Sequence, residues 1–305
     1  MTRAHFQRFA LILLVYTILV ILWGAWVRIS HSGDGCGDTW PLCHGQLIPM
    51  AEQGKTWVEY AHRLMSGLYG FIVLYFWWVA RKIYPKGHFA RKAALASLIF
   101  MITEASLGAK LVLFKLVGTN DTPLRAIFMA LHQMNSFMLT GAVALTYAAA
   151  QRENNRPLAS LPRVMSLFPW LIVLIGITGA WAALSGTLFP TQDLLQGLYD
   201  DFSQQAHYLV RLRVLHPILA LLGGGSLSLF FWIQANTTKD SLLQKKSLQM
   251  ALILFVGLCF GVLTLLSHAP IWMKLVHLTL AQIIWVTLLQ WLYFVKDHNS
   301  KNFLR

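Results

Sequence analysis

Charged residues are scarce in this sequence, and long polar segments are missing. Only 12% of its 305 residues are charged, whereas soluble domains have about 25%. The longest polar connection between apolar runs extends from Val27 to Thr56, which is too short for a separate soluble domain. The shortage of charge excludes an ordinary soluble enzyme and favours a chain that lies mostly in a membrane.

Two short motifs are also missing. The C-x-x-C-H motif that attaches haem covalently does not occur among the three cysteines. No clear A-x-A cleavage site follows the first apolar run, which is longer than the apolar core of a signal peptide. We therefore expect this run to be a retained helix.

Apolar residues instead form eight long runs, and 56% of the chain is hydrophobic. A helix that spans a membrane needs roughly 20 mostly apolar residues. The sequence thus predicts an all-α integral membrane protein with eight transmembrane helices. The runs are Phe6–Trp26, Trp57–Ala80, Ala93–Leu113, Leu124–Ala149, Met165–Leu188, Tyr208–Ala235, Leu248–Ser267 and Ile271–Val295.

Basic residues are unevenly divided between the two sides of the predicted membrane. Most of the 25 Lys and Arg residues lie near the termini and in the connections after even-numbered runs, while most acids lie on the other side. The positive-inside rule then places both termini in the cytoplasm. The net charge of +13 is that of a basic cytoplasmic rim, so we expect no nucleic-acid partner.

The chain carries signs of an internal duplication. The sequence W-G-A-W at residues 23–26 resembles T-G-A-W at 178–181, an offset of 155. Histidines in the second and sixth runs, and in the fourth and eighth, repeat at offsets of 154 and 145; they are His62, His216, His132 and His277. These markers predict two tandem four-helix bundles with pseudo-twofold symmetry, formed by residues 1–150 and 151–305.

These four histidines lie at similar depths inside even-numbered runs. Ionisable groups in membrane helices are rare and are functional candidates. Neutral imidazole binds haem iron well, and two facing helices of a bundle can hold a flat cofactor. Zinc or copper, a proton relay and plain packing are the alternatives, although two histidines alone are an incomplete zinc shell.

The stretch WVEYAHRLMSG, residues 57–67, begins the second run with three ionisable side chains. Glu59, His62 and Arg63 are spaced to lie on adjacent turns of one helix face. Arg63 is a candidate partner for a haem propionate. The alternative is an ordinary ion pair between Glu59 and Arg63 at the start of a helix.

The second half departs from this pattern. Pro217 follows His216, so the propionate-binding candidates there are Arg211 and Arg213, within one and a half turns before it. Pro217 also frees the carbonyl of Arg213, which predicts a local irregularity in the helix. This half has no acid at the position equivalent to Glu59.

The chain resembles the haem A synthase family. The matching elements are EYAHR (59–63), MALH (129–132), the histidines of runs six and eight, and GCGDTWPLCHG (35–45). The resemblance covers nearly the whole chain. It implies an oxidoreductase of heme A biosynthesis in the bacterial inner membrane, which oxidises the C8 methyl of haem O to a formyl group.

The resemblance also implies roles for individual residues. His216 and His277 would be axial ligands of a resident haem b cofactor. His62 and His132 would face the substrate haem O, and Glu59 would be the catalytic carboxylate. Candidate partners are the haem O synthase, cytochrome oxidase assembly factors, an electron partner that the sequence does not name, and a second copy of the chain.

Two further features carry open interpretations. Cys36 and Cys43 lie in an outer loop that faces an oxidising compartment, so we expect a disulfide. The disulfide could be a plain staple or, as the resemblance implies, a redox-active or haem-handling lid. The alternative to a disulfide is a zinc site formed by both cysteines with His31 and His44. Glu104, in the middle of the third run, is a candidate proton path or a protonated packing residue.

Two rival functions fit the same histidines. A cytochrome b-type subunit with two haems would pass electrons without altering a porphyrin, and a haem transporter or chaperone would use the histidine pairs as transit sites. Because Glu59 occurs in only one half, it argues against a pure electron carrier.

Overall fold

Helices make up all the regular structure in the residues that the computed structural model describes, which are 1–50, 53–152, 158–191 and 193–302, the side chains of 299–302 excepted. An isolated β-bridge joins Cys43 and Gln46. The helices are α1 (Arg3–Ile29), α2 (Gly54–Ile83), α3 (Phe89–Leu113), α4 (Pro123–Ala150), α5 (Arg163–Leu188), α6 (Leu194–Phe202), α7 (Tyr208–Arg213), α8 (Leu215–Leu219), the π-helix η1 (Ala220–Gly224), α9 (Gly225–Thr237), α10 (Ser241–Leu266) and α11 (Ile271–Asn302).

Seven helical segments are long and apolar enough to cross a membrane. Six of them are α1, α2, α3, α5, α10 and α11, and the seventh is Tyr208–Thr237, which contains α7 to α9. Large apolar side chains such as Phe71, Leu222 and Phe255 point outward and are well exposed, as expected for helices surrounded by lipid. The chain is therefore a multi-pass membrane protein.

Helix α4 has the length of a span but a more polar composition. It packs against α1, α3, α5 and α11, and half of its 28 residues are buried, including Asn135, Ser136 and Thr140. Asn135 and Ser136 bond to side chains of α3, and Thr140 bonds to the Ser136 carbonyl within α4. Because these polar groups are buried and bonded, α4 can be less apolar than the other helices.

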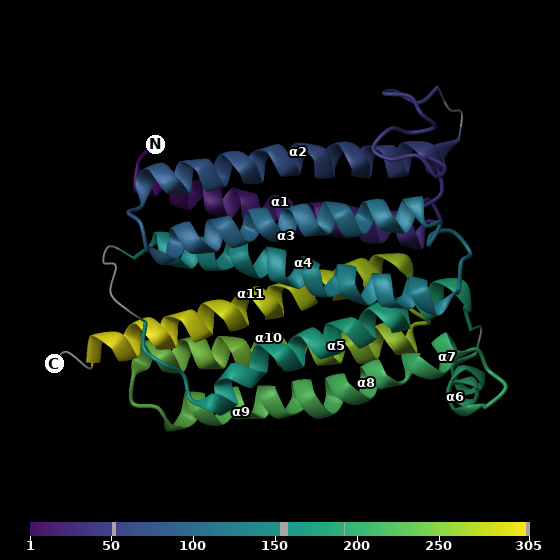
Figure 1. Ribbon diagram of the computed structural model, residues 1–305. Helices are drawn as coiled ribbons and strands as arrows, with labels where there is room; N and C mark the ends of the chain where they lie inside the picture. The colour runs from purple at the N-terminus through teal and green to yellow at the C-terminus, as the bar shows by residue number, and fades with distance from the viewer. Residues whose placement is uncertain (51–52, 153–157, 192, 303–305) are drawn as a thin grey trace.

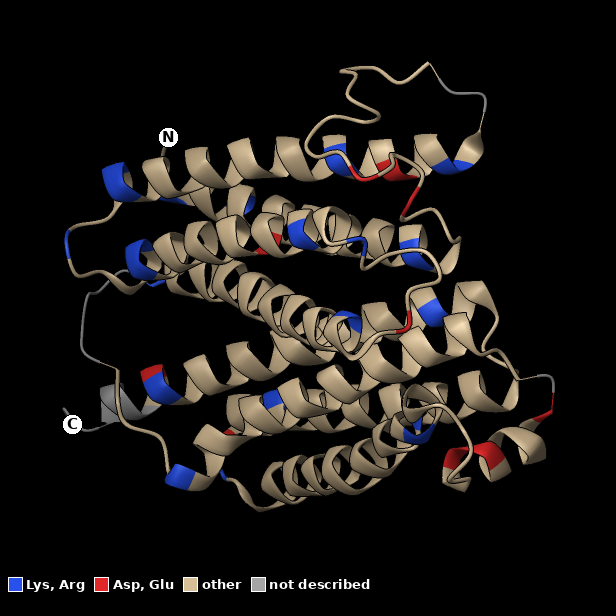
Figure 2. Cartoon of the chain, turned by 45° about the vertical axis from the view of Figure 1, so that its right-hand side comes forward, with Lys and Arg blue, Asp and Glu red and all other residues tan. Residues whose placement is uncertain are grey.

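The helices form two layers. In Figure 1, α1 to α4 lie above α5, α9 and α10, and α11 runs between them beside α4. The start of α1 and the end of α11 lie at one end of the bundle, and the α1–α2 loop and α6 lie at the other. Figure 2 shows acidic residues along the loops and α6 at this second end.

The predicted irregularity around Pro217 is confirmed. The run from residue 208 divides into α7, α8, the π-helix η1 and α9. Proline lacks the N–H that would bond to the carbonyl of Arg213, so regular α-helical bonding is interrupted there. His216 therefore lies in a five-residue helix between two irregularities.

The proposed division at residue 150 stays a prediction. Within the polar link after α4, residues 153–157 lie outside the described part of the chain. The two groups of helices meet through α1, α4, α5 and α11.

Candidate functional site

Each of the four membrane histidines packs against a glycine on the preceding long helix. The pairs are Gly24 with His62, Gly108 with His132, Gly179 with His216, and Gly261 with His277. A methyl group on Gly24, Gly179 or Gly261 would lie only 3.0, 3.0 or 2.9 Å from the imidazole Cε1. At Gly108 the distance is an ordinary 3.9 Å. Three of the four rings thus need a glycine to hold their positions.

His216 and His277 face each other across the second half. Their ring centroids lie 6.1 Å apart and the ring planes cross at 78°. Imidazole nitrogens about 2 Å on either side of one metal ion put the ring centroids roughly 6 Å apart. His216 Nδ1 and the Ile175 carbonyl are hydrogen-bonded at 3.1 Å. Because Nδ1 is then the donor, Nε2 is unprotonated and available to a metal.

The first-half pair has a different surrounding. His62 and His132 are close enough to interact electrostatically. His132 Nδ1 lies 3.5 Å from Glu104 Oε2, which is long for a hydrogen bond. Glu104 is held from α4, because Asn135 Nδ2 donates to Oε2 at 2.6 Å and the Ser136 hydroxyl donates to Oε1. A carboxylate thus lies near Nδ1 of His132, whereas a backbone carbonyl accepts a hydrogen bond from Nδ1 of His216.

Several ring nitrogens in these pairs have no hydrogen-bond partner among the described residues. The Nδ1 atoms of His62, His132 and His277 are buried in this way. An unsatisfied buried polar atom costs free energy, so such atoms mark places where a ligand or water completes the structure. The four histidines thus supply, in two pairs, imidazole donors of the kind that bind haem iron.

Glu59 lies beneath the α1–α2 loop and is only 4% exposed. Its Oε1 accepts hydrogen bonds from Arg63 Nη2 at 2.6 Å and Nε at 3.2 Å, and its Oε2 accepts the Cys36 amide at 2.8 Å. Arg63 Nη1 donates to the carbonyls of Thr39 and Leu42, both at 2.6 Å. The alternative ion pair is present, while the catalytic and propionate-binding roles stay predictions.

Cys36 and Cys43 form a disulfide within this loop. Because both sulfurs are bonded to each other, the alternative of a zinc site is wrong. Both cysteines are completely buried, and thiol exchange requires an accessible sulfur. The described geometry favours the plain staple over the redox-active lid.

The two arginine candidates of the second half have different surroundings. Arg213 forms an ion pair with Asp201 and donates from Nη2 to the Gly197 carbonyl at 2.8 Å. Both contacts fasten α6 to α7, and Arg211 is exposed. Burial raises the pKa of the Asp201 carboxyl, although Arg213 acts in the opposite direction. Like Arg63, Arg213 is engaged by protein groups.

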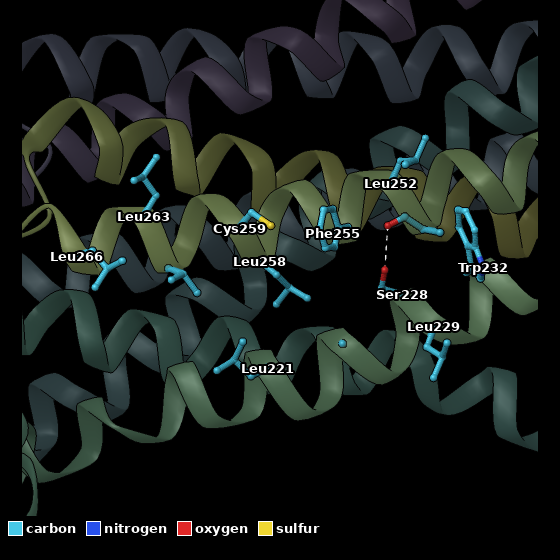
Figure 3. Close-up of a pocket in the computed structure, with 13 residues that line it drawn as sticks. Leu221, Ser228, Leu229, Trp232, Leu252, Phe255, Leu258, Cys259, Leu263 and Leu266 are labelled. Atoms are coloured by element: carbon cyan, nitrogen blue, oxygen red, sulfur yellow. Dashed lines mark hydrogen bonds between the residues drawn. The ribbon is translucent and has the colours of Figure 1, made fainter.

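An apolar groove of about 920 Å³ lies between α9 and α10 (Figure 3). It is lined by Leu221, Gly225, Ser228, Leu229, Trp232, Ala251, Leu252, Phe255, Leu258, Cys259, Val262, Leu263 and Leu266. None of the four histidines or the predicted acids is among these lining residues. The groove is therefore separate from the candidate site.

The glycines are the functional residues that sequence reasoning missed. Two of them stand in the repeated G-A-W sequences, which indicated duplication without a reason for the glycine. The structure supplies this reason, because Gly24 and Gly179 each make room for an imidazole ring.

A family comparison covers most of the chain. The COX15-CtaA family, described as "Cytochrome oxidase assembly protein", matches residues 7–289. A protein named heme A synthase from Shouchella clausii is 28% identical over 314 residues, which cover 97% of this chain and 98% of that protein. A heme A synthase from Symbiobacterium thermophilum is 29% identical over a region that covers 88% of this chain and 88% of that protein.

Another relative is longer than this chain. A protein named protoheme IX farnesyltransferase from Thermus thermophilus is 37% identical over 276 residues. The aligned region covers 90% of this chain but 45% of that protein. The chain thus spans less than half the length of this relative.

Proposed function

Because the chain belongs to the COX15-CtaA family of cytochrome oxidase assembly proteins, we propose that it is a membrane oxidoreductase that converts haem O to haem A. The observation that carries this proposal is the difference between the two histidine pairs. Both pairs pack against glycines, but among the described residues the carboxylates Glu59 and Glu104 accompany the first-half pair. Such a difference suits one half that holds a permanent cofactor and another that performs chemistry.

In this proposal, the second half holds haem b. The spacing of the His216 and His277 rings and the free Nε2 of His216 support them as axial ligands. A haem held in this way supplies one-electron transfer. The backbone hydrogen bond from Nδ1 to Ile175 holds the His216 ring in place and fixes its tautomer.

The first half receives haem O between His62 and His132. The Glu104 carboxylate lies beside His132 Nδ1, and a carboxylate in this position raises the basicity of an imidazole ligand. This proximity supports a positioning role of Glu104 toward His132, and the proton path considered from sequence stays a prediction.

Glu59 is the catalytic carboxylate in this assignment. In the present state its oxygens are occupied by donors from Arg63 and Cys36. It accepts a substrate proton, or stabilises positive charge beside the substrate methyl, once one of these donors is released. Arg63 therefore governs when Glu59 is available.

We further propose eight spans in two tandem bundles, with α4 as the eighth. The glycine–histidine pairs support the duplication, because Gly24 and Gly179 are 155 residues apart and Gly108 and Gly261 are 153 apart. The disulfide loop would face outward, and both termini would lie in the cytoplasm of a bacterium. The distribution of basic residues supports this orientation.

The partner that supplies substrate is proposed to be a protohaem farnesyltransferase. The region similar to this chain forms 45% of a longer protein with that name, which suits two activities that work in succession. The product would then pass to cytochrome oxidase assembly.

Pigment analysis tests the proposed function. The protein is expressed in a host that makes haem O but no haem A, and the extracted pigments are identified. Haem A in the extract supports the proposal. Haem B alone, at two per chain, would instead identify a cytochrome b-type electron carrier, and unchanged haem O would identify a transporter or chaperone.

A further inference from the structure

Three basic side chains come from three helices that pack against one another. Arg28 is at the end of α1, Arg125 is in the first turn of α4, and Lys274 is in the first turn of α11. The helices α1, α4 and α11 are mutual neighbours, and α11 belongs to the opposite half. Arg125 is close enough to repel Arg28 electrostatically, and Arg28 is close enough to repel Lys274.

Helix periodicity places each cation directly outward of the candidate site. Arg28 is four residues after Gly24, and Lys274 is three residues before His277. Arg125 is seven residues, or two turns, before His132. Residues at these spacings share one helix face, and the rise of 1.5 Å per residue sets the cations roughly 5–10 Å from the imidazole level.

Two of these cations, Arg28 and Arg125, have buried donors that lack partners among the described residues. Arg28 Nη1 and Arg125 Nε are buried and make no hydrogen bond. Arg125 is only 4% exposed; its Nη1 donates to the carbonyls of Gly118 at 2.8 Å and Asn120 at 2.5 Å. The Arg125 side chain is thus held in place by two hydrogen bonds, while its Nε–H has no acceptor among the described residues.

The local charge is incompletely balanced. Asp34 and Asp121 attract Arg125 electrostatically. The charged groups that interact with Arg28 and Lys274 are other cations, which repel them. Uncompensated buried charge is costly. A bound anion would remove this cost and satisfy both free donors.

We propose that Arg28, Arg125 and Lys274 form a carboxylate site between the halves, which binds the propionate groups of the iron porphyrin. This inference rests on the proposed function and adds carboxylate-binding residues to the candidates Arg63, Arg211 and Arg213. Porphyrin propionates project from one ring edge, and the three cations lie outward of the imidazole level, where they would bind that edge if it faces outward. The Lys274 contribution ties the second half to the first.

The test compares protohaem with its dimethyl ester, in which both carboxylates are blocked. Haem-depleted full-length protein is reconstituted in nanodiscs of phosphatidylcholine, and binding of each ferric porphyrin is followed by its absorbance. The wild type is expected to bind the free acid roughly 10- to 100-fold more tightly, the range expected for charge-assisted hydrogen bonds. R28M and K274M are expected to lose this preference, while their affinity for the ester is unchanged.

Two further variants separate this role from a structural one. K110M removes an exposed cation at the outer end of α3 and is expected to retain the full preference. R28K retains the charge and is expected to keep part of it. Without haem, R28M should melt no lower than wild type, because the change removes a charge whose charged neighbours are cations.

The outcomes are distinct. If the wild type binds neither porphyrin, the proposed function fails together with the site. If haem binds but the wild type does not prefer the free acid, or R28M keeps the preference, only the carboxylate site is overturned. Nanodiscs with phosphatidylglycerol test a lipid headgroup: loss of copurified anionic lipid in R28M, with the porphyrin preference intact, would also overturn the proposal.

Discussion

Replacing Gly179 by alanine tests whether the glycines position the ligands. The added methyl would lie 3.0 Å from His216 Cε1 and 3.1 Å from Nδ1. Ordinary Cβ contacts begin near 3.4 Å, so the ring must move by a few tenths of an ångström. This movement strains the 3.1 Å hydrogen bond from Nδ1 to Ile175.

The expected cost in stability is small, whereas the effect on the ligand is large. Overpacking costs about 1–3 kcal/mol, and alanine gains about 1 kcal/mol of helix propensity over glycine. The free energy of unfolding should therefore fall by about 0–2 kcal/mol. Optical and electron paramagnetic resonance spectra of bound haem b should show a shift from low-spin toward high-spin iron.

Gly186 provides the matched control on the same helix. A methyl group there would have no atom within 4 Å, so G186A should gain helix propensity and leave the spectrum unchanged. If G179A and G186A gave identical spectra and midpoint potentials, the glycine contact would have no positioning role. The equivalent G24A change should spare the haem b spectrum and weaken haem O binding.

Three further predictions concern other contacts. E104Q should lower haem A formation and alter the spectrum of first-half haem, while the haem b spectrum persists; equal loss of both spectra would show a folding role instead. R63M should release the loop carbonyls of Thr39 and Leu42 and lower the melting temperature, with R211M at an exposed site as the comparison. His88 Nδ1 caps α3 by accepting the Ala90 amide, and burial, with Arg3 and Arg152, lowers its pKa from 6.5. The unfolded chain then binds more protons, so this part of the stability is lost as pH falls below about 6.5; H88N should flatten that part of the melting-temperature profile.

The sequence predicted the helices well because lipid imposes a simple rule. The run Met165–Leu188 became α5, Arg163–Leu188, and Ala93–Leu113 became α3, Phe89–Leu113. The additional residues lie at helix ends, where capping groups such as His88 decide the boundary. Helix α6 was not predicted, although Asp193 accepts the Leu195 amide at its start and apolar side chains follow at helical spacing.

Contacts between distant residues were less accessible to sequence reasoning. Glu104 has no partner within a turn, and its actual partners, Asn135 and Ser136, come from the next helix. Arg63 contacts loop carbonyls whose positions depend on how the disulfide loop folds back. Such contacts follow from tertiary packing, which residue spacing on one helix does not reveal. The cofactor and the roles of the site residues remain predictions.

The loop over Glu59 has a kinetic consequence. Glu59 is almost completely buried. The loop that covers it is cross-linked by the Cys36–Cys43 disulfide and is bonded to Arg63 through two backbone carbonyls. If protons reach Glu59 from the outside, the loop must first move away from it. The rate of that loop movement would then limit the turnover of a reaction that needs such exchange.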